Sequence, residues 1–136
     1  MKKIVLLLSF VLCLAAVGRS QTVRNANNSF IAKMESNGTV RDGNNSMLAR
    51  IQSDGVIRDP NNRYLGKVET DGTVRDRNNS ALGKVESDGR VRNTNNSTLG
   101  RIYPDGAVRD KNNHTLGYAR DIPARYAALF FFFNLF

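Results

Sequence analysis

The chain has 136 residues, of which 24% are charged, and its formal net charge is +8. This length accommodates one domain, and the single cysteine excludes a disulfide within the chain. The basic residues are spread evenly with acidic residues between them. We therefore expect a solvated surface of mixed charge and no nucleic-acid partner.

The segment 1–20 has the layout of a signal peptide. Two lysines precede the apolar stretch 4–17, and small residues at positions 18 and 20 fit cleavage before Gln21. The apolar stretch is short for a membrane span, which argues against an uncleaved anchor. Cys13 follows Leu12 rather than a small residue, which argues against a lipid anchor. We predict export to the periplasm, the cell surface or the medium, and a mature chain without cysteine.

Residues 22–120 consist of a 17-residue unit that is repeated without a slip in spacing. A typical unit reads Val-Arg-Asp-x-Asn-Asn, followed by Leu-Gly-Lys-Val-Glu-Ser-Asp-Gly after two variable residues. Tandem units of this length indicate an architecture in which neighbouring units share one core. The units begin at Val23, Val40, Ile57, Val74, Val91 and Val108.

Each unit predicts two tight turns joined by short strands. One turn is Asp-Gly or Asn-Gly between β-branched residues, which is the strongest local signal for a β-hairpin. A two-residue loop at Asp71-Gly72 would put Val68 opposite Arg75, whereas a three-residue loop over 70–72 puts Val68 opposite Val74. We favour the three-residue loop because it keeps both valines on one face. The five turns are Asn37-Gly38, Asp54-Gly55, Asp71-Gly72, Asp88-Gly89 and Asp105-Gly106.

The second turn is the x-Asn-Asn-x segment, for example residues 77–80. Asparagine tolerates the left-handed backbone region, and its side chain can hydrogen-bond the nearby backbone. A small residue follows in the middle of the next strand, where it usually marks a bulge or a close approach of another unit. These small residues are Ala32, Ala49, Gly66, Gly83, Gly100 and Gly117.

Two architectures fit such units: a closed ring of hairpins, or a β-solenoid with one unit per rung. A solenoid would stack the arginines of successive units about 4.8 Å apart, and like charges directly opposite each other are destabilising. Half-hairpins at the two ends of the array, near Val23 and Leu116, can pair and remove both exposed sheet edges. The sequence therefore predicts an all-β, flower-like or propeller-like closed ring of five complete short hairpins plus a split closing pair.

The residues also carry a resemblance to a known family. The leader followed by Gln-Thr-Val-Arg, the tandem Val-Arg-Asp-x-Asn-Asn-x-x-Leu-Gly-Lys-[Val/Ile]-Glu-Ser-Asp-Gly units and the Phe-rich end resemble the bacterial five-fold β-flower proteins. The likeness covers essentially the whole chain and implies a small exported flower of hairpins, in a family with no established activity. Because this chain has six units, the ring is either six-fold or five-fold with a divergent terminus.

The tail, residues 121–136, breaks the repeat. Its segment 127–136 is apolar except for Asn134 and contains the four consecutive phenylalanines 130–133. Such a run has neither a helical nor a strand period, so both of its faces must be covered. We expect the tail to pack on the ring as a plug or an added strand. Self-association and membrane contact through 127–136 are the alternatives.

The strictly repeated exposed residue is an arginine, which makes it the candidate ligand-binding residue. Six symmetric copies either bind an anionic or polar ligand, such as a glycan, or pair with aspartates of neighbouring units and hold the ring together. The six copies are Arg24, Arg41, Arg58, Arg75, Arg92 and Arg109.

The sequence offers no sign of catalysis, a cofactor or a metal. The Asp-x-Asn-Asn segments lack the glycine and the glutamate of a calcium-binding loop, and His114 replaces a serine or arginine on a turn. The function stays unknown from the sequence. The sequence favours a non-catalytic exported structural or interaction module, with an envelope glycan or a protein as partner. The alternative is a protein that binds envelope glycans or anionic ligands through the arginine ring.

Overall fold

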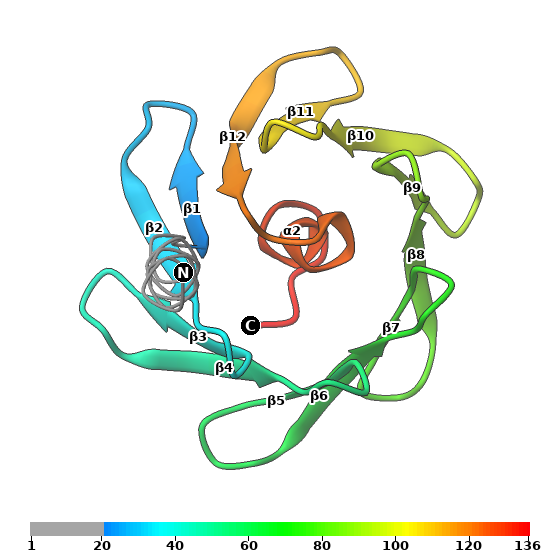
Figure 1. Ribbon diagram of the computed structural model, residues 1–136. Helices are drawn as coiled ribbons and strands as arrows, with labels where there is room; N and C mark the ends of the chain where they lie inside the picture. Colours follow the sequence, from blue (N-terminus) through cyan, green and yellow to red (C-terminus); the bar gives the residue numbers. More distant parts are fainter. Residues whose placement is uncertain (1–20) are drawn as a thin grey trace, which may run out of the picture.

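The computed structural model describes residues 21–136, so the predicted signal peptide at 1–20 lies outside the described residues. Twelve antiparallel strands follow one another around a closed ring, and β12 pairs back onto β1 (Figure 1). The predicted all-β closed ring is confirmed. The elements are β1 Gln21–Asn25, β2 Phe30–Met34, β3 Thr39–Asp42, β4 Met47–Ile51, β5 Val56–Arg58, β6 Tyr64–Val68, β7 Thr73–Asp76, β8 Ala81–Val85, β9 Arg90–Asn93, β10 Thr98–Ile102, β11 Ala107–Asp110, β12 Thr115–Arg120 and helix α2 Ala124–Phe131.

The ring has six petals, each a hairpin that projects outward (Figure 1). The outer end of each petal is the x-Asn-Asn-x turn, here called the asparagine corner. Neighbouring petals meet at junctions, five of which are bridged by an Asp-Gly or Asn-Gly turn. The sixth junction has no such turn and is closed by the pairing of β1 with β12, in which Val23 lies opposite Ala119. The ring is therefore six-fold. The petals are β1–β2, β3–β4, β5–β6, β7–β8, β9–β10 and β11–β12.

The turn at the β6–β7 junction has a three-residue loop. The Glu69 N–H donates to the Thr73 carbonyl at 2.8 Å, and the Gly72 N–H donates back to the Glu69 carbonyl at 3.0 Å. Gly72 has a φ of 94°, in the left-handed region that favours glycine. The resulting register puts Val68 opposite Val74, as the sequence predicts.

The asparagine corners repeat the same backbone geometry. In the β7–β8 petal the Asp76 N–H donates to the Ser80 carbonyl at 2.9 Å, and the Asn79 N–H donates to the Asp76 carbonyl at 3.0 Å. Asn79 has a φ of 64°, so asparagine takes the left-handed place that glycine takes in the other turn. One period of 17 residues thus holds two short strands and two three-residue loops of one design.

The inner face of the ring is a layer of β-branched side chains that are fully buried. Beside each of them the register of the petal shifts by one residue, which makes a bulge. The bulged residue is an isoleucine or leucine: Ile31, Leu48, Leu65, Leu82, Leu99 and Leu116. The fully buried layer comprises Val23, Val40, Ile57, Val74, Val91 and Val108.

The tail fills the centre of the ring as helix α2 (Figure 1). Ala127 and Ala128 are completely buried, and Leu129 is 3% exposed. The start of the helix lies at the end of the ring that carries the Asp-Gly turns, here called the turn end. The segment is a helix inside the ring, not an added strand. No helix within residues 21–136 is long and apolar enough to cross a membrane.

The glycines in the strands make room for the phenylalanines of the tail. A methyl group added to Gly117, Gly100 or Gly83 would lie 2.6–2.8 Å from the nearest ring atom of Phe131, Phe132 and Phe133, in that order. Consecutive phenylalanines thus face consecutive petals around the ring. This arrangement explains why the run has no helical or strand period.

The first two petals carry alanine where the others carry glycine. Ala32 borders a hollow of about 330 Å³ between these petals and the end of the tail. Phe130 and Phe136 line this hollow, and their rings meet edge to face at a centroid distance of 5.3 Å. The tail therefore packs less closely on this side of the ring.

Gly83→Ala tests the close packing of the tail against the strands. The added methyl would lie 2.3 Å from the Arg92 carbonyl oxygen and 2.8 Å from the Phe133 ring, so neighbouring groups must move. We expect the free energy of unfolding to fall by about 1–3 kcal/mol in urea denaturation. Gly43→Ala is the control, because its methyl would have only Phe30 nearby, at 3.9 Å, and should leave stability unchanged.

Leu129→Ala tests whether the tail stabilises the ring from within. Removing this buried side chain should lower the free energy of unfolding by about 2–5 kcal/mol, while the protein keeps its size in gel filtration. Asn134→Ala, at an exposed position of the same tail, should change stability by less than about 0.5 kcal/mol. Dissociation of an oligomer with unchanged monomer stability would contradict the role of the tail as a plug.

Candidate functional site

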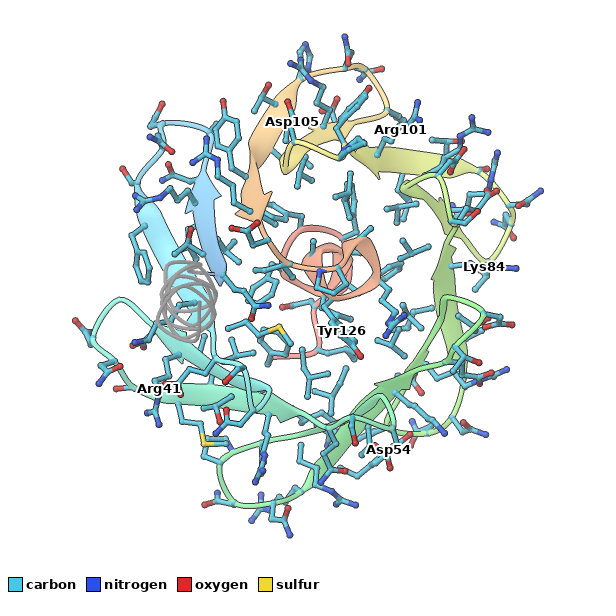
Figure 2. The ribbon with its side chains drawn as sticks, viewed as in Figure 1. Arg41, Asp54, Lys84, Arg101, Asp105 and Tyr126 are labelled. Carbon is cyan, nitrogen blue, oxygen red and sulfur yellow. The ribbon has the colours of Figure 1, made fainter. Side chains whose placement is uncertain are left out.

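The six repeated arginines lie on the outer face of the ring, here called the outer wall. Each follows a buried β-branched residue, and successive side chains of a strand point to opposite faces. Figure 2 shows Arg41, Lys84 and Arg101 on the outside and Tyr126 at the centre. The arginines are half-buried, so their guanidinium groups lie against the wall rather than extending fully into solvent.

Each arginine is tied to the corner of its own petal. The Arg75 Nη1 donates to the carbonyl oxygen of Asn79 at 3.1 Å. The other five arginines make the same hydrogen bond at 3.0–3.2 Å. This contact satisfies a carbonyl that the left-handed corner turns away from the strand ladder.

Three arginines also contact a glutamate across a junction. The Arg41 Nε donates to the Glu35 Oε1 at 2.8 Å, and Arg75 and Arg92 pair in the same way with Glu69 and Glu86. The prediction of pairing with a neighbouring aspartate is wrong, because the aspartates are engaged elsewhere. These half-exposed pairs contribute about 0–1 kcal/mol each to stability.

The aspartates cap the corners. The Asp76 Oδ1 accepts from the backbone N–H of Asn78 at 2.9 Å and from that of Ser80 at 3.0 Å. The other five corners have the same pair of bonds, with asparagine in place of aspartate at two of them. Across residues 21–136 no group of three or more His, Cys, Asp or Glu side chains is placed to hold a metal ion.

The outer wall brings basic residues together in pairs. Lys67 lies directly opposite Arg75 on the neighbouring strand. Four further junctions have the same arrangement, and at the closing junction Tyr118 lies opposite Arg24. The other basic pairs are Lys33 with Arg41, Arg50 with Arg58, Lys84 with Arg92, and Arg101 with Arg109.

This pairing changes two conclusions from the sequence. The basic residues are evenly spread along the chain but concentrated across the junctions in space. The register that puts Val68 opposite Val74 also puts Lys67 opposite Arg75, so the signal was present in the turn. Like charges also lie opposite each other in the ring, so their repulsion in a solenoid does not by itself favour the closed ring that the structure confirms.

Compensation of the basic pairs is uneven. At the β4–β5 junction the repeated glutamate is replaced by Gln52, and at the β10–β11 junction by Tyr103. The guanidinium carbons of Arg101 and Arg109 lie 5.1 Å and 6.0 Å from the centroid of the Tyr103 ring. These two junctions therefore lack the carboxylate that accompanies the basic pair at the other bridged junctions.

Backbone hydrogen bonds lower the pKa of several turn aspartates. The main cause is the N–H of Thr73 for the pKa of Asp71, that of Arg90 for Asp88 and that of His114 for Asp110. Each bond favours the ionised carboxylate, which is the better acceptor. The caps are therefore strongest while the carboxylates are charged.

Comparison with known protein families identifies the family to which the chain belongs. The family model described as 5-fold beta-flower protein matches residues 20–135. The chain belongs to the 5-fold β-flower proteins. This β-flower protein departs from the count in the family's description, because its ring closes with six petals. No curated protein and no solved structure matches the chain.

The lowered aspartate pKa values predict that the β-flower protein loses stability in acid. A carboxyl group whose pKa is lower in the folded state than in the unfolded chain stabilises the fold above the unfolded pKa, near 4, and stops doing so as the pH falls through the folded value. We expect the Tm to be nearly constant from about pH 8 to 5 and to fall below about pH 4.

Asp71→Asn with Asp88→Asn is the matched variant for this measurement. Asparagine keeps an acceptor oxygen, and Asn37 already caps the Thr39 N–H at 3.0 Å in this way. The variant should show a shallower fall of Tm in acid than the parent. An equal fall in both proteins would assign the acid sensitivity to other groups.

Proposed function

We propose that this β-flower protein is a non-catalytic, exported interaction module whose outer wall binds acidic polysaccharides of the cell envelope. The observation that supports the proposal is the pairing of basic side chains across five junctions. Membership of the β-flower family does not itself assign an activity.

The basic pairs are not required by the fold. Like charges directly opposite each other on neighbouring strands destabilise a sheet. At the closing junction Tyr118 occupies the place of the lysine opposite Arg24, so a neutral residue fits there. An anion that bridges both basic groups would relieve the repulsion.

The distribution of the pairs suits a polymer better than a single small ion. The pairs recur from petal to petal around the wall, as a chain with regularly spaced carboxylates would require. Residues 21–136 contain 17 basic and 12 acidic residues, a net charge of +5, which attracts polyanions at long range. Guanidinium groups also match carboxylates in a bidentate geometry.

Export would bring this wall into contact with envelope polysaccharides. The predicted signal peptide supports this location, and an acidic polysaccharide is then a partner that the protein would meet. Each arginine uses one Nη1 proton for its hydrogen bond to the corner carbonyl. Other N–H groups of the guanidinium remain as donors for a ligand.

Charge reversal on the wall tests the proposal. Lys67→Glu with Lys84→Glu converts two opposed basic pairs into pairs of opposite charge, so the fold should keep its stability. We expect binding of alginate, a polymer of uronic acids, to weaken on the order of tenfold in isothermal titration calorimetry. Binding by the parent should also weaken as salt rises.

Arg77→Glu with Lys111→Glu is the matched control. It makes the same change in net charge at the exposed corners of two petals. The control should retain most of the binding if the wall pairs are the site. Equal losses of alginate binding in both variants would overturn the proposal. A parent protein that binds alginate no better than it binds neutral dextran would also overturn it.

A further inference from the structure

A hollow of about 560 Å³ opens at the turn end of the ring. It lies between the Asn37-Gly38 turn and the Asp54-Gly55 turn, with Tyr126 of α2 on its inner side. The helix packs against β8 and β10, which leaves space beside the petals on the opposite side. The volume falls in the range of about 300–1,000 Å³ that is typical of small-ligand sites.

The hollow combines an apolar floor with a polar rim. Met34, Ile51 and Tyr126 provide the apolar surface, of which Ile51 and Tyr126 are buried. The Tyr126 hydroxyl accepts from the Arg125 Nη2 at 3.3 Å, which leaves its own proton for a ligand. Asn37 and Gln52 lie on the rim, where the Asn37 Oδ1 accepts from the Thr39 N–H at 3.0 Å and the Asn37 side-chain NH2 group remains a donor.

The two amides are departures from the repeat, and both border this hollow. Asn37 stands where the four other turns have aspartate, at positions 54, 71, 88 and 105. Gln52 stands where three other units have glutamate, at positions 35, 69 and 86. The turn does not need the change, because an aspartate caps the equivalent backbone N–H in the other turns.

We propose that this hollow binds a single saccharide ring. A sugar has an apolar face, which suits the floor, and hydroxyl groups that both donate and accept hydrogen bonds. Side-chain amides can do both, whereas ionised carboxylates only accept. Replacing two carboxylates by amides therefore converts two rim positions that only accept hydrogen bonds into positions that can also donate them to sugar hydroxyl groups.

The rim also carries one basic and one acidic side chain, which determine the substituents that a bound sugar can have. Arg50 lies at the outer edge of the hollow and Asp54 on its turn. The guanidinium accommodates a carboxylate substituent, and Asp54 keeps a carboxylate oxygen beyond the one that accepts from Val56. The site shares two residues with the wall: Arg50 belongs to a basic pair, and Gln52 stands at the same junction in the place of the wall glutamate.

Titration of the mature protein with glucose, N-acetylglucosamine and glucuronic acid tests the site. Backbone amide resonances of Gly38, Gln52 and Ser53 should shift in nitrogen–proton correlation spectra, with saturation at or below the order of 10 mM. Tightest binding of glucuronic acid would place Arg50 in the site. No shift with any of the three sugars would overturn the proposal.

Asn37→Asp with Gln52→Glu restores the residues that most other units carry, so the fold should be kept. We expect binding of the sugar to weaken on the order of tenfold. Glu69→Gln with Asp71→Asn makes the reverse exchange at the β6–β7 junction and should leave the affinity unchanged. Equal weakening in both variants would overturn the assignment to this hollow.

Asn37→Asp alone separates this site from the wall, because Gln52→Glu also returns a carboxylate to the basic pair at the β4–β5 junction. The single variant should weaken sugar binding and leave alginate binding unchanged. Alginate binding is measured on the same variants, and Arg50 is left in place in all of them. Loss of sugar binding with retained alginate binding in the Asn37→Asp protein would support two separate sites. Loss of both together would contradict a saccharide site distinct from the wall.

Discussion

The ring depends on one backbone constraint, the left-handed residue at the third position of every three-residue loop. Glycine supplies it at the five junction turns and asparagine at the six corners. The loop fixes the register, and a slip of one residue would turn each strand over. The same register that buries Val74 against its neighbours sets Lys67 opposite Arg75. The ordered interior and the charged wall are therefore two consequences of one turn.

A closed ring creates an interior that must be filled from every side. The strands supply small residues at their centres, and the tail supplies large ones. An ordinary surface helix has one polar face because one side meets water. Helix α2 and the residues after it are surrounded by petals, so Phe131, Phe132 and Phe133 each pack against a different petal. Phe130 packs against the ring of Phe136 instead. Close packing of this kind explains why glycine rather than a larger residue occupies the strand centres.

The sequence predicted what the repeat dictates locally. The turn at Asp71-Gly72, the Asn78-Asn79 corner and the closure of β1 on β12 all follow from backbone chemistry. The helix did not follow, because the run 130–133 has no period and its burial depends on a ring formed elsewhere in the chain. The glutamate partner of Arg75 was also missed. Asp76 is adjacent in sequence but is committed to its corner, whereas Glu69 becomes a neighbour only through the register.

The tail imposes asymmetry on a six-fold ring. A single helix of eight residues cannot make equal contacts with six petals, so it packs against β8 and β10 and leaves the other side open. The repeated positions build the ring and its charged wall in the same way in one unit after another. The units on the open side differ: Ala32 replaces a glycine, Asn37 an aspartate and Gln52 a glutamate. The positions that break the repeat beside a hollow therefore distinguish one side of the ring from the other, whereas the repeated basic pairs are shared around it.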